Sequence, residues 1–226
     1  MNANSRPVLL TVSATLFAVL VVLALNLNAD WMTAPDDAVE RWLDAHRSAR
    51  WRLDADGAFG YLGRPLHVAT AGVVGGALLA WRSRSVLPLA LVTGGVGAGV
   101  LLEQTFKAVF GRSDATLAAL HDGSLTAYSH SFPSGHVTGA TTLLGMIAVC
   151  VGVGRGAAVK AALAVLVSAG VVAVACLALY SRAHIFSDVI GGMALGSAIV
   201  SLGAAALVGS RQQASGPAPT ASPVIG

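Results

Sequence analysis

The chain has 226 residues, of which 55% are hydrophobic and only 11% are charged, and its mean hydropathy is +0.72. A soluble globular domain carries about 25% charged residues, so this composition excludes an ordinary soluble enzyme and predicts a membrane protein. The net charge of +3 comes from basic residues spread along the chain, a pattern that predicts no nucleic-acid partner.

Six apolar stretches are long enough, or nearly so, to cross a bilayer as helices, which takes roughly 17–25 residues. The first is too long for a signal peptide and lacks a clear cleavage site, so we expect it to be retained. The second is short and is expected to begin nearer Phe59. We therefore predict an all-α polytopic membrane protein whose six transmembrane helices form a bundle. The stretches are Val8–Leu27, Leu66–Trp81, Val86–Phe106, Val137–Val153, Ala161–Tyr180 and Val189–Val208.

One sizeable polar segment, Ala29–Pro65, separates the first two stretches. Its apolar residues recur at helical spacing, so it predicts a short amphipathic helix that either lies on the outer leaflet or packs over the bundle. After Arg211 the chain is rich in Ala, Pro, Ser and Gly, which is typical of disorder. We expect a single domain over 1–211, with 29–65 as its outer segment and 212–226 as a disordered tail.

The charged residues predict the topology. If the N-terminus is cytoplasmic, the short loops Trp81–Ser85 and Gly154–Lys160 lie inside. All of their charged residues are basic, as the positive-inside rule requires. The acidic residues then fall outside or at the outer edge of the membrane. We expect a multi-pass protein of the cell membrane with both termini in the cytoplasm and the polar helix junctions described next on the extracytoplasmic face.

A polar run, Ser131–His136, lies just before the fourth stretch. A helix N-terminus offers free N–H groups and the positive end of the helix dipole, which suits an anion. Ser134 can add its hydroxyl, Gly135 allows a close approach of the backbone to a phosphate, and His136 falls in the first turn. The alternative is that Ser134 only caps the helix and that His136 is an interfacial histidine.

His184 and Asp188 precede the sixth stretch and are spaced so that they share one helical face. A carboxylate on one imidazole nitrogen fixes the tautomer and makes the other nitrogen more nucleophilic. The alternative is a structural pair at a helix junction, although ionisable residues at membrane depth usually mark function.

Three basic residues, Lys107, Arg112 and Arg182, lie at helix ends on the same expected face. Such side chains either reach lipid headgroups or hold phosphate oxygens, which the planar guanidinium matches best. The loop before Ser131 also holds His121, Asp122 and His130, but without the tight spacing of metal ligands, so no metal site is predicted.

The chain resembles the type 2 phosphatidic acid phosphatase family, which includes lipid phosphate phosphatases and haloperoxidase-like proteins, in its bacterial membrane branch. Pro133, Ser134, Gly135 and His136 match the family's second motif in full, and His184 and Asp188 match the second half of its third motif. The resemblance implies that His184 is the nucleophile, that Asp188 orients it and that His136 protonates the leaving oxygen. It also implies that Lys107, arginines and the Ser134-Gly135 backbone hold the phosphate, with no metal and no cofactor.

Two positions depart from the family's motifs. Asp114 stands where the first motif has an arginine, so we assign that role to Arg112, two residues earlier. Ala178 stands where the third motif has an arginine, and Arg182 lies one helical turn later. If the helix continues to Arg182, the two positions share a face and Arg182 can serve the same phosphate.

The sequence thus predicts a metal-independent phosphatase that acts at the extracytoplasmic face through a phosphohistidine. Its partners would be a lipid phosphate or prenyl diphosphate and the membrane, with no obligate protein partner. The alternatives are a degraded or vanadate-type member of the family, a non-enzymatic membrane protein or a small transporter, which ordinarily has more ionisable groups near mid-membrane. Undecaprenyl diphosphate, phosphatidate, phosphatidylglycerol phosphate and a prenyl-phosphoryl sugar phosphate all remain possible substrates.

Overall fold

The computed structural model describes residues 5–62, 65–113, 116 and 128–214, and within these ranges every regular element is a helix. This confirms the predicted all-α fold. The elements are α1 (Ser5–Leu25), α2 (Asp30–His46), α3 (Ala49–Leu62), α4 (Pro65–Ser83), α5 (Leu87–Val109), α7 (Gly135–Gly152), α8 (Ala157–Tyr180) and α9 (Phe186–Ala214).

The helices α1, α5, α7, α8 and α9 are each long and apolar enough to cross a membrane. The helices α3 and α4 together pass the same test as a pair bent by 52°, which gives up to six spans in the described part of the chain. Phe59, where we expected the second span to start, lies in α3 before the bend. Exposed apolar side chains cover the flanks of the bundle, as lipid contact requires, among them Val8, Leu25, Leu78, Leu101 and Leu166.

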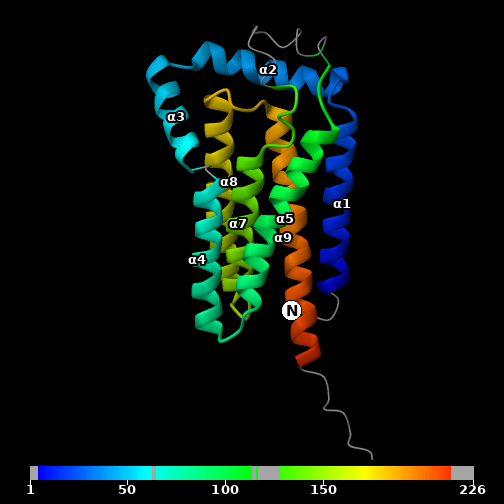
Figure 1. Cartoon of the computed structure of the whole chain (residues 1–226), viewed down its shortest axis with the longest axis vertical. Helices are drawn as coiled ribbons and strands as arrows, with labels where there is room; N and C mark the ends of the chain where they lie inside the picture. The colour runs from blue at the N-terminus through cyan, green and yellow to red at the C-terminus, as the bar shows by residue number, and fades with distance from the viewer. Residues whose placement is uncertain (1–4, 63–64, 114–115, 117–127, 215–226) are drawn as a thin grey trace, which may run out of the picture.

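The helix α7 lies at the centre of the bundle, beside α5, α8 and α9, while α1 runs along α9 (Figure 1). Glycines on α9 allow α7 to approach it closely. A Cβ at Gly192 would lie 2.7 Å from the carbonyl oxygen of Ser134, and one at Gly196 would lie 2.6 Å from Cβ of Thr141. Small residues at helix interfaces are typical of packing in lipid. Here they bring the N-terminal ends of α7 and α9 side by side.

Two apolar clusters fill the bundle. The larger joins α1, α5, α7 and α9 around Leu20, Val92, Phe132, Met146 and Leu195. The smaller lies between α3, α7, α8 and α9, and its buried members are Phe59, Val137, Val171, Ala175, Ala178 and Val189. It matters for function because it adjoins the helix ends that carry His136 and His184.

The polar segment after α1 forms two helices rather than the single one that we expected. The helix α2 crosses the end of the bundle, and α3 descends beside α8 (Figure 1). On α2, Met32, Asp36 and Leu43 are buried, so the helix packs over the bundle. Its outer face carries exposed tryptophans: the exposed fraction is 54% for Trp31 and 60% for Trp42.

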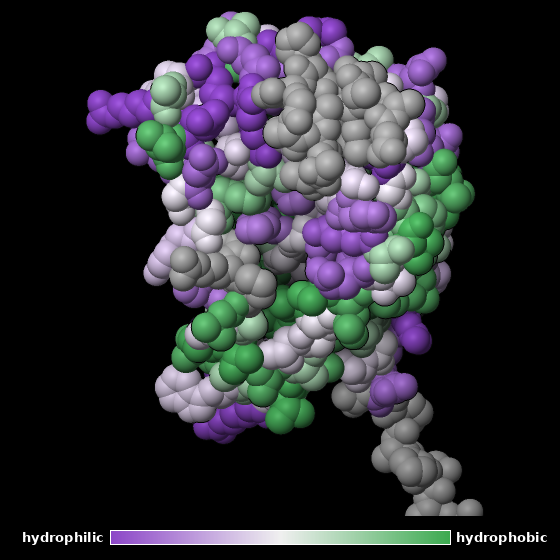
Figure 2. Space-filling view, turned by 45° about the horizontal axis from the view of Figure 1, so that its top comes forward, coloured by the Kyte–Doolittle hydropathy of each residue, from purple (hydrophilic) through white to green (hydrophobic). Residues whose placement is uncertain are grey.

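The basic loops gather at the opposite end of the bundle. The α4–α5 and α7–α8 connections, the start of α1 and the end of α9 all lie there (Figure 1). Hydrophilic residues also cover the end that carries α2, above a largely hydrophobic flank (Figure 2). Which end faces the cytoplasm stays a prediction. The helix α9 continues to Ala214, so the tail cannot begin at residue 212; residues 215–226 lie outside the described part.

Candidate active site

His184 lies in the short turn between α8 and α9, and its imidazole is fixed by the first turn of α9. Nδ1 of His184 is 3.2 Å from Oδ2 of Asp188, and both residues are buried. The backbone N–H of His184 donates to the carbonyl oxygen of Ala178 in the last turn of α8. Contact of a carboxylate with Nδ1 leaves Nε2 as the reactive nitrogen, which is the arrangement of an activated nucleophile.

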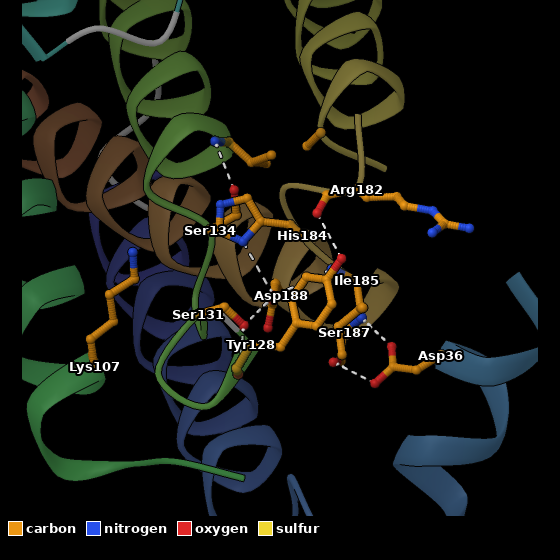
Figure 3. A network of polar contacts seen from close by, with 12 residues as sticks. Asp36, Lys107, Tyr128, Ser131, Ser134, Arg182, His184, Ile185, Ser187 and Asp188 are labelled. Atoms are coloured by element: carbon orange, nitrogen blue, oxygen red, sulfur yellow. Dashed lines mark hydrogen bonds and ion pairs between the residues drawn. The ribbon is translucent and has the colours of Figure 1, made fainter. Parts of the chain in front are cut away.

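Asp188 is fully buried and is held from several sides. Its Oδ1 accepts from Nη2 of Arg112 at 2.7 Å. Its Oδ2 accepts from Oγ of Ser131 at 2.7 Å (Figure 3). A buried carboxylate is tolerated only when it is paired and hydrogen-bonded. This set of partners keeps Asp188 ionised and aims its second oxygen at His184.

Arg112 supports Asp188, and this differs from the phosphate contact that the sequence predicted. Its Nη1 donates to the carbonyl oxygen of Tyr128 and to Oγ of Ser131, at 3.0 and 2.9 Å. Its Nη2 donates to Oγ of Ser187 and to Asp188. The guanidinium is fully buried, and both of its terminal nitrogens are saturated. In this structure Arg112 therefore lies behind the His184–Asp188 pair and has no terminal nitrogen donor left for a phosphate.

The N-terminus of α7 lies directly beside this pair. Ser134 caps the helix, because its Oγ accepts from the N–H of Val137 at 3.4 Å. Its own N–H donates to the carbonyl oxygen of Asp188 at 2.9 Å, which ties the two helix starts together. Within the described residues, the N–H groups of Gly135 and His136 make no hydrogen bond. These two groups are therefore the donors at the helix start that are available to an anion.

Glu103 of α5 approaches the same helix start. A Cβ at Gly135 would lie 2.8 Å from Oε1 of Glu103, so no residue with a side chain fits there without displacing the carboxylate. Glu103 is buried and forms an ion pair with Lys107, one turn later on α5. The sequence singled out Lys107 as a phosphate ligand; the i, i+4 spacing of Glu103 and Lys107 is the local signal that this pair would form, and it was missed.

Phe59 of α3 covers the two histidines. Its ring stacks on His136 with centroids 4.0 Å apart and meets His184 edge-on at 6.2 Å. The two imidazole rings are 6.3 Å apart at their centroids. The two histidines therefore lie next to each other, and Phe59 packs against both rings. From the sequence, Phe59 was predicted only to mark the start of the second span.

Comparison with known proteins now assigns the chain to a family. The sequence model of the PAP2 superfamily matches residues 85–209, which is more than half of the chain and contains both histidines.

The chain belongs to the PAP2 superfamily. Its fold also matches the crystal structure of a transmembrane PAP2-type phosphatidylglycerolphosphate phosphatase from Bacillus subtilis. That match has a TM-score of 0.68 and 21% sequence identity, and it covers 90% of this chain and 97% of the other. A search of curated proteins found none that matches.

Arg182, one of the two arginines that depart from the PAP2 motifs, does not lie where we expected. The helix α8 ends at Tyr180, and Arg182 follows with a φ of 56°, so positions 178 and 182 do not share a helical face. Its side chain points away from His184 (Figure 3) and pairs with Asp44, and with Glu40 at 3.2 Å, both on α2. The helical argument was therefore wrong, because the turn breaks the helix first.

Ala178, where the PAP2 motif has its arginine, is fully buried in the smaller apolar cluster with Phe59 and Val137. The space that an arginine side chain would need beside His184 is thus filled by apolar groups. At this position the chain therefore has a buried apolar residue where the family motif has an arginine.

Asp36 and Tyr128 support the site, and sequence reasoning missed both. Asp36 of α2 accepts from the N–H and Oγ of Ser187, at 2.6 and 2.7 Å, and so caps α9 (Figure 3). Burial raises the pKa of Asp36 to about 6, against the lowering effect of the Ser187 hydrogen bonds. Tyr128 donates to the carbonyl oxygen of Arg182 at 2.6 Å, and burial raises its pKa to about 12. Contacts 151 and 54 residues apart leave no local sequence signal.

Of the loop residues that we considered as metal ligands, His130 is the one that the structure describes. Nδ1 of His130 contacts the carbonyl oxygen of Lys107 at 2.8 Å, while His121 and Asp122 lie outside the described residues. No group of three or more His, Cys, Asp or Glu side chains within the described ranges is arranged to hold a metal ion.

Proposed function

We propose that the chain is a membrane phosphatase that hydrolyses a lipid phosphate or prenyl diphosphate through a phosphohistidine at His184. The observation that carries the proposal is the contact between His184 Nδ1 and the buried carboxylate of Asp188. Membership of the PAP2 superfamily and the fold of a transmembrane PAP2-type phosphatase support it.

In the first step, Nε2 of His184 attacks the phosphorus atom, and the bond between phosphorus and the lipid oxygen breaks. His136 donates a proton to that oxygen, and the dephosphorylated lipid leaves. In the second step, a water molecule attacks the phosphohistidine while His136 accepts its proton, which releases inorganic phosphate and restores His184. Both steps use one histidine as nucleophile and the other as general acid and base.

The phosphate would be held by groups of the same helix ends. The N–H groups of Gly135 and His136 point out of the start of α7, where the helix dipole favours negative charge. Lys107 would supply a positive charge once it leaves Glu103. Arg112 acts indirectly here, by fixing Asp188.

The experiment that tests the proposal measures phosphate release by the purified protein in detergent. The panel contains undecaprenyl diphosphate, phosphatidate, phosphatidylglycerol phosphate and a prenyl-phosphoryl sugar phosphate, with a soluble phosphomonoester as comparison. We expect release from at least one lipid, faster than from the soluble ester, that persists with a metal chelator. Release from none of them, or activity lost to the chelator and restored by metal, would contradict the proposal.

A second candidate is a family member that binds lipid phosphates with little turnover. Three observations favour it: Asp114 replaces a motif arginine, Arg182 pairs with α2, and Glu103 neutralises Lys107. Saturable binding of a lipid phosphate, without phosphate release and without a trapped phosphoenzyme, would select this candidate.

We also propose that the site faces the extracytoplasmic side, because the acid-free basic loops lie at the other end of the bundle. Single cysteines introduced at Ser48, near the site, and at Ser83, at the opposite end, test this in a background without Cys150 and Cys176. An impermeant thiol reagent applied to intact cells should label Ser48→Cys and spare Ser83→Cys. The reverse pattern would overturn the orientation.

A further inference from the structure

A cavity lies at the end of the bundle opposite the histidines. Its volume is about 940 Å³, within the range of roughly 300–1,000 Å³ typical of ligand sites. The last turns of α7 and α9 and the first turns of α8 form it, and α1 contributes Leu9. Its walls are mostly apolar and include Val149, Leu163, Val167 and Leu207.

Three of the five polar residues in this lining are basic, and the other two are Ser168 and Gln212. Arg155 and Lys160 come from the α7–α8 connection and the first turn of α8, and Arg211 comes from the end of α9. Arg155 and Lys160 are exposed and, among the residues that the structure describes, neither pairs with a carboxylate. No acidic side chain in the described ranges lines the cavity.

These features together specify the chemistry of an occupant. Apolar walls inside the bilayer exclude a water-soluble anion as the main ligand and suit acyl chains. Basic side chains at the membrane surface attract anionic headgroups, and basic pockets between transmembrane helices bind such lipids. We propose that this cavity binds an anionic phospholipid, whose headgroup phosphate contacts Arg155 and Lys160 and whose acyl chain lies between α7, α8 and α9.

This site is separate from the catalytic one. The helix α7 has 18 residues, so at about 1.5 Å per residue its two ends are roughly 27 Å apart. A headgroup phosphate bound at Arg155 and Lys160 therefore cannot contact His136 or His184, so this lipid is not bound as a substrate. The inference does not depend on catalysis and would hold for an inactive family member as well.

The test measures lipid binding by native mass spectrometry of the full-length protein in detergent mixed with phosphatidylglycerol or phosphatidylcholine. Thermal unfolding in nanodiscs of each lipid gives a second readout. We expect phosphatidylglycerol to bind more tightly and to raise the Tm. The pair Arg155→Gln with Lys160→Gln should lower its affinity by roughly 25-fold, at about 1 kcal/mol for each basic residue.

Two matched controls make the result specific. Arg82→Gln with Arg84→Asn removes two charges at the same end of the bundle but outside the cavity, and it should leave binding unchanged. Ala164→Phe places a bulky side chain in the cavity without changing the charge, and it should weaken binding. Ala162→Phe, at a position that is also exposed on α8 but lies outside the lining, should leave binding unchanged.

Equal losses in the two charge pairs would show a general surface attraction and overturn the proposal. Binding that is insensitive to Ala164→Phe would overturn it too, because the acyl chain would then lie elsewhere. Equal binding of both lipids would show that the cavity does not select an anionic headgroup, and it would also overturn the proposal. Phosphate release by the same variants is recorded separately, so that a failure here cannot be confused with a failure of the catalytic proposal.

Discussion

The carboxylate of Glu103 lies against Gly135, at the start of α7. A Cβ at Gly135 would come within 2.8 Å of Oε1 of Glu103, and Lys107 pairs with the same carboxylate. Because Lys107 is already paired with Glu103, a substrate phosphate has to compete with this carboxylate for Lys107.

Glu103→Gln should therefore strengthen phosphate binding. The amide keeps the shape but removes the competing charge, and a partly exposed ion pair of this kind is worth roughly 0.2–1 kcal/mol. We expect inhibition by inorganic phosphate to tighten by about 2- to 5-fold, with a similar fall in KM. A fall in kcat with no change in the inhibition constant would instead make Glu103 a group that assists the reaction.

The two histidines should fail in different ways. His184→Ala removes the nucleophile, so no phosphate release and no phosphoenzyme are expected. His136→Ala removes the general acid and base, which contributes roughly 10²–10⁴-fold, and should let the phosphoenzyme accumulate. Rapid quenching with labelled substrate at alkaline pH, where phosphohistidine survives, measures both. Near-normal turnover by His184→Ala would rule the mechanism out.

Arg112→Met should damage stability more than phosphate affinity. It leaves the buried carboxylate of Asp188 without its ion-pair partner, and breaking a buried pair costs about 3–5 kcal/mol. Adding Asp188→Asn removes the stranded charge and should recover much of the Tm without recovering activity. If Arg112→Met keeps its Tm and loses only phosphate affinity, Arg112 binds substrate directly, as the sequence suggested.

Arg182→Ala should change kcat/KM little, because its guanidinium pairs with Glu40 and Asp44 rather than facing His184. Loss of a true phosphate contact would cost about 1.5–3 kcal/mol, or roughly 10- to 100-fold in kcat/KM. Asp44→Asn is the matched control from the other side of the pair. A loss of activity in Arg182→Ala that Asp44→Asn does not reproduce would restore Arg182 to the phosphate site.

The raised pKa of Asp36 predicts a pH dependence of stability. An acid whose pKa is about 6 when folded and 3.8 when unfolded binds more protons in the folded state between these values. The free energy of unfolding should therefore fall as pH rises from about 4 to above 6, by roughly 3 kcal/mol at most. The Tm of the wild type should fall over this range, and Asp36→Asn should abolish that component. An equal slope in Asp36→Asn would assign the effect to another group.

The fold class, five of the spans and the pairing of His184 with Asp188 follow from local features of the sequence. Long uncharged stretches have one stable outcome in a bilayer, because every backbone group must be satisfied within the helix. The spacing of His184 and Asp188 is local, and the structure brings them together as a single helical turn would. The motif around His136 carried the family resemblance for the same reason, since its residues are consecutive.

Which charged side chains contact one another depends on the tertiary structure. Arg112 reaches Asp188 across 76 residues, Asp36 caps Ser187 across 151, and Arg182 turns to α2. A cation at a helix end can face a phosphate, a lipid headgroup or a carboxylate. The choice depends on which anion the fold brings within about 3 Å in a buried place, where the electrostatic interaction is strongest. The sequence shows which charged residues are present, and the packing of α2, α5 and α9 determines which of them form pairs.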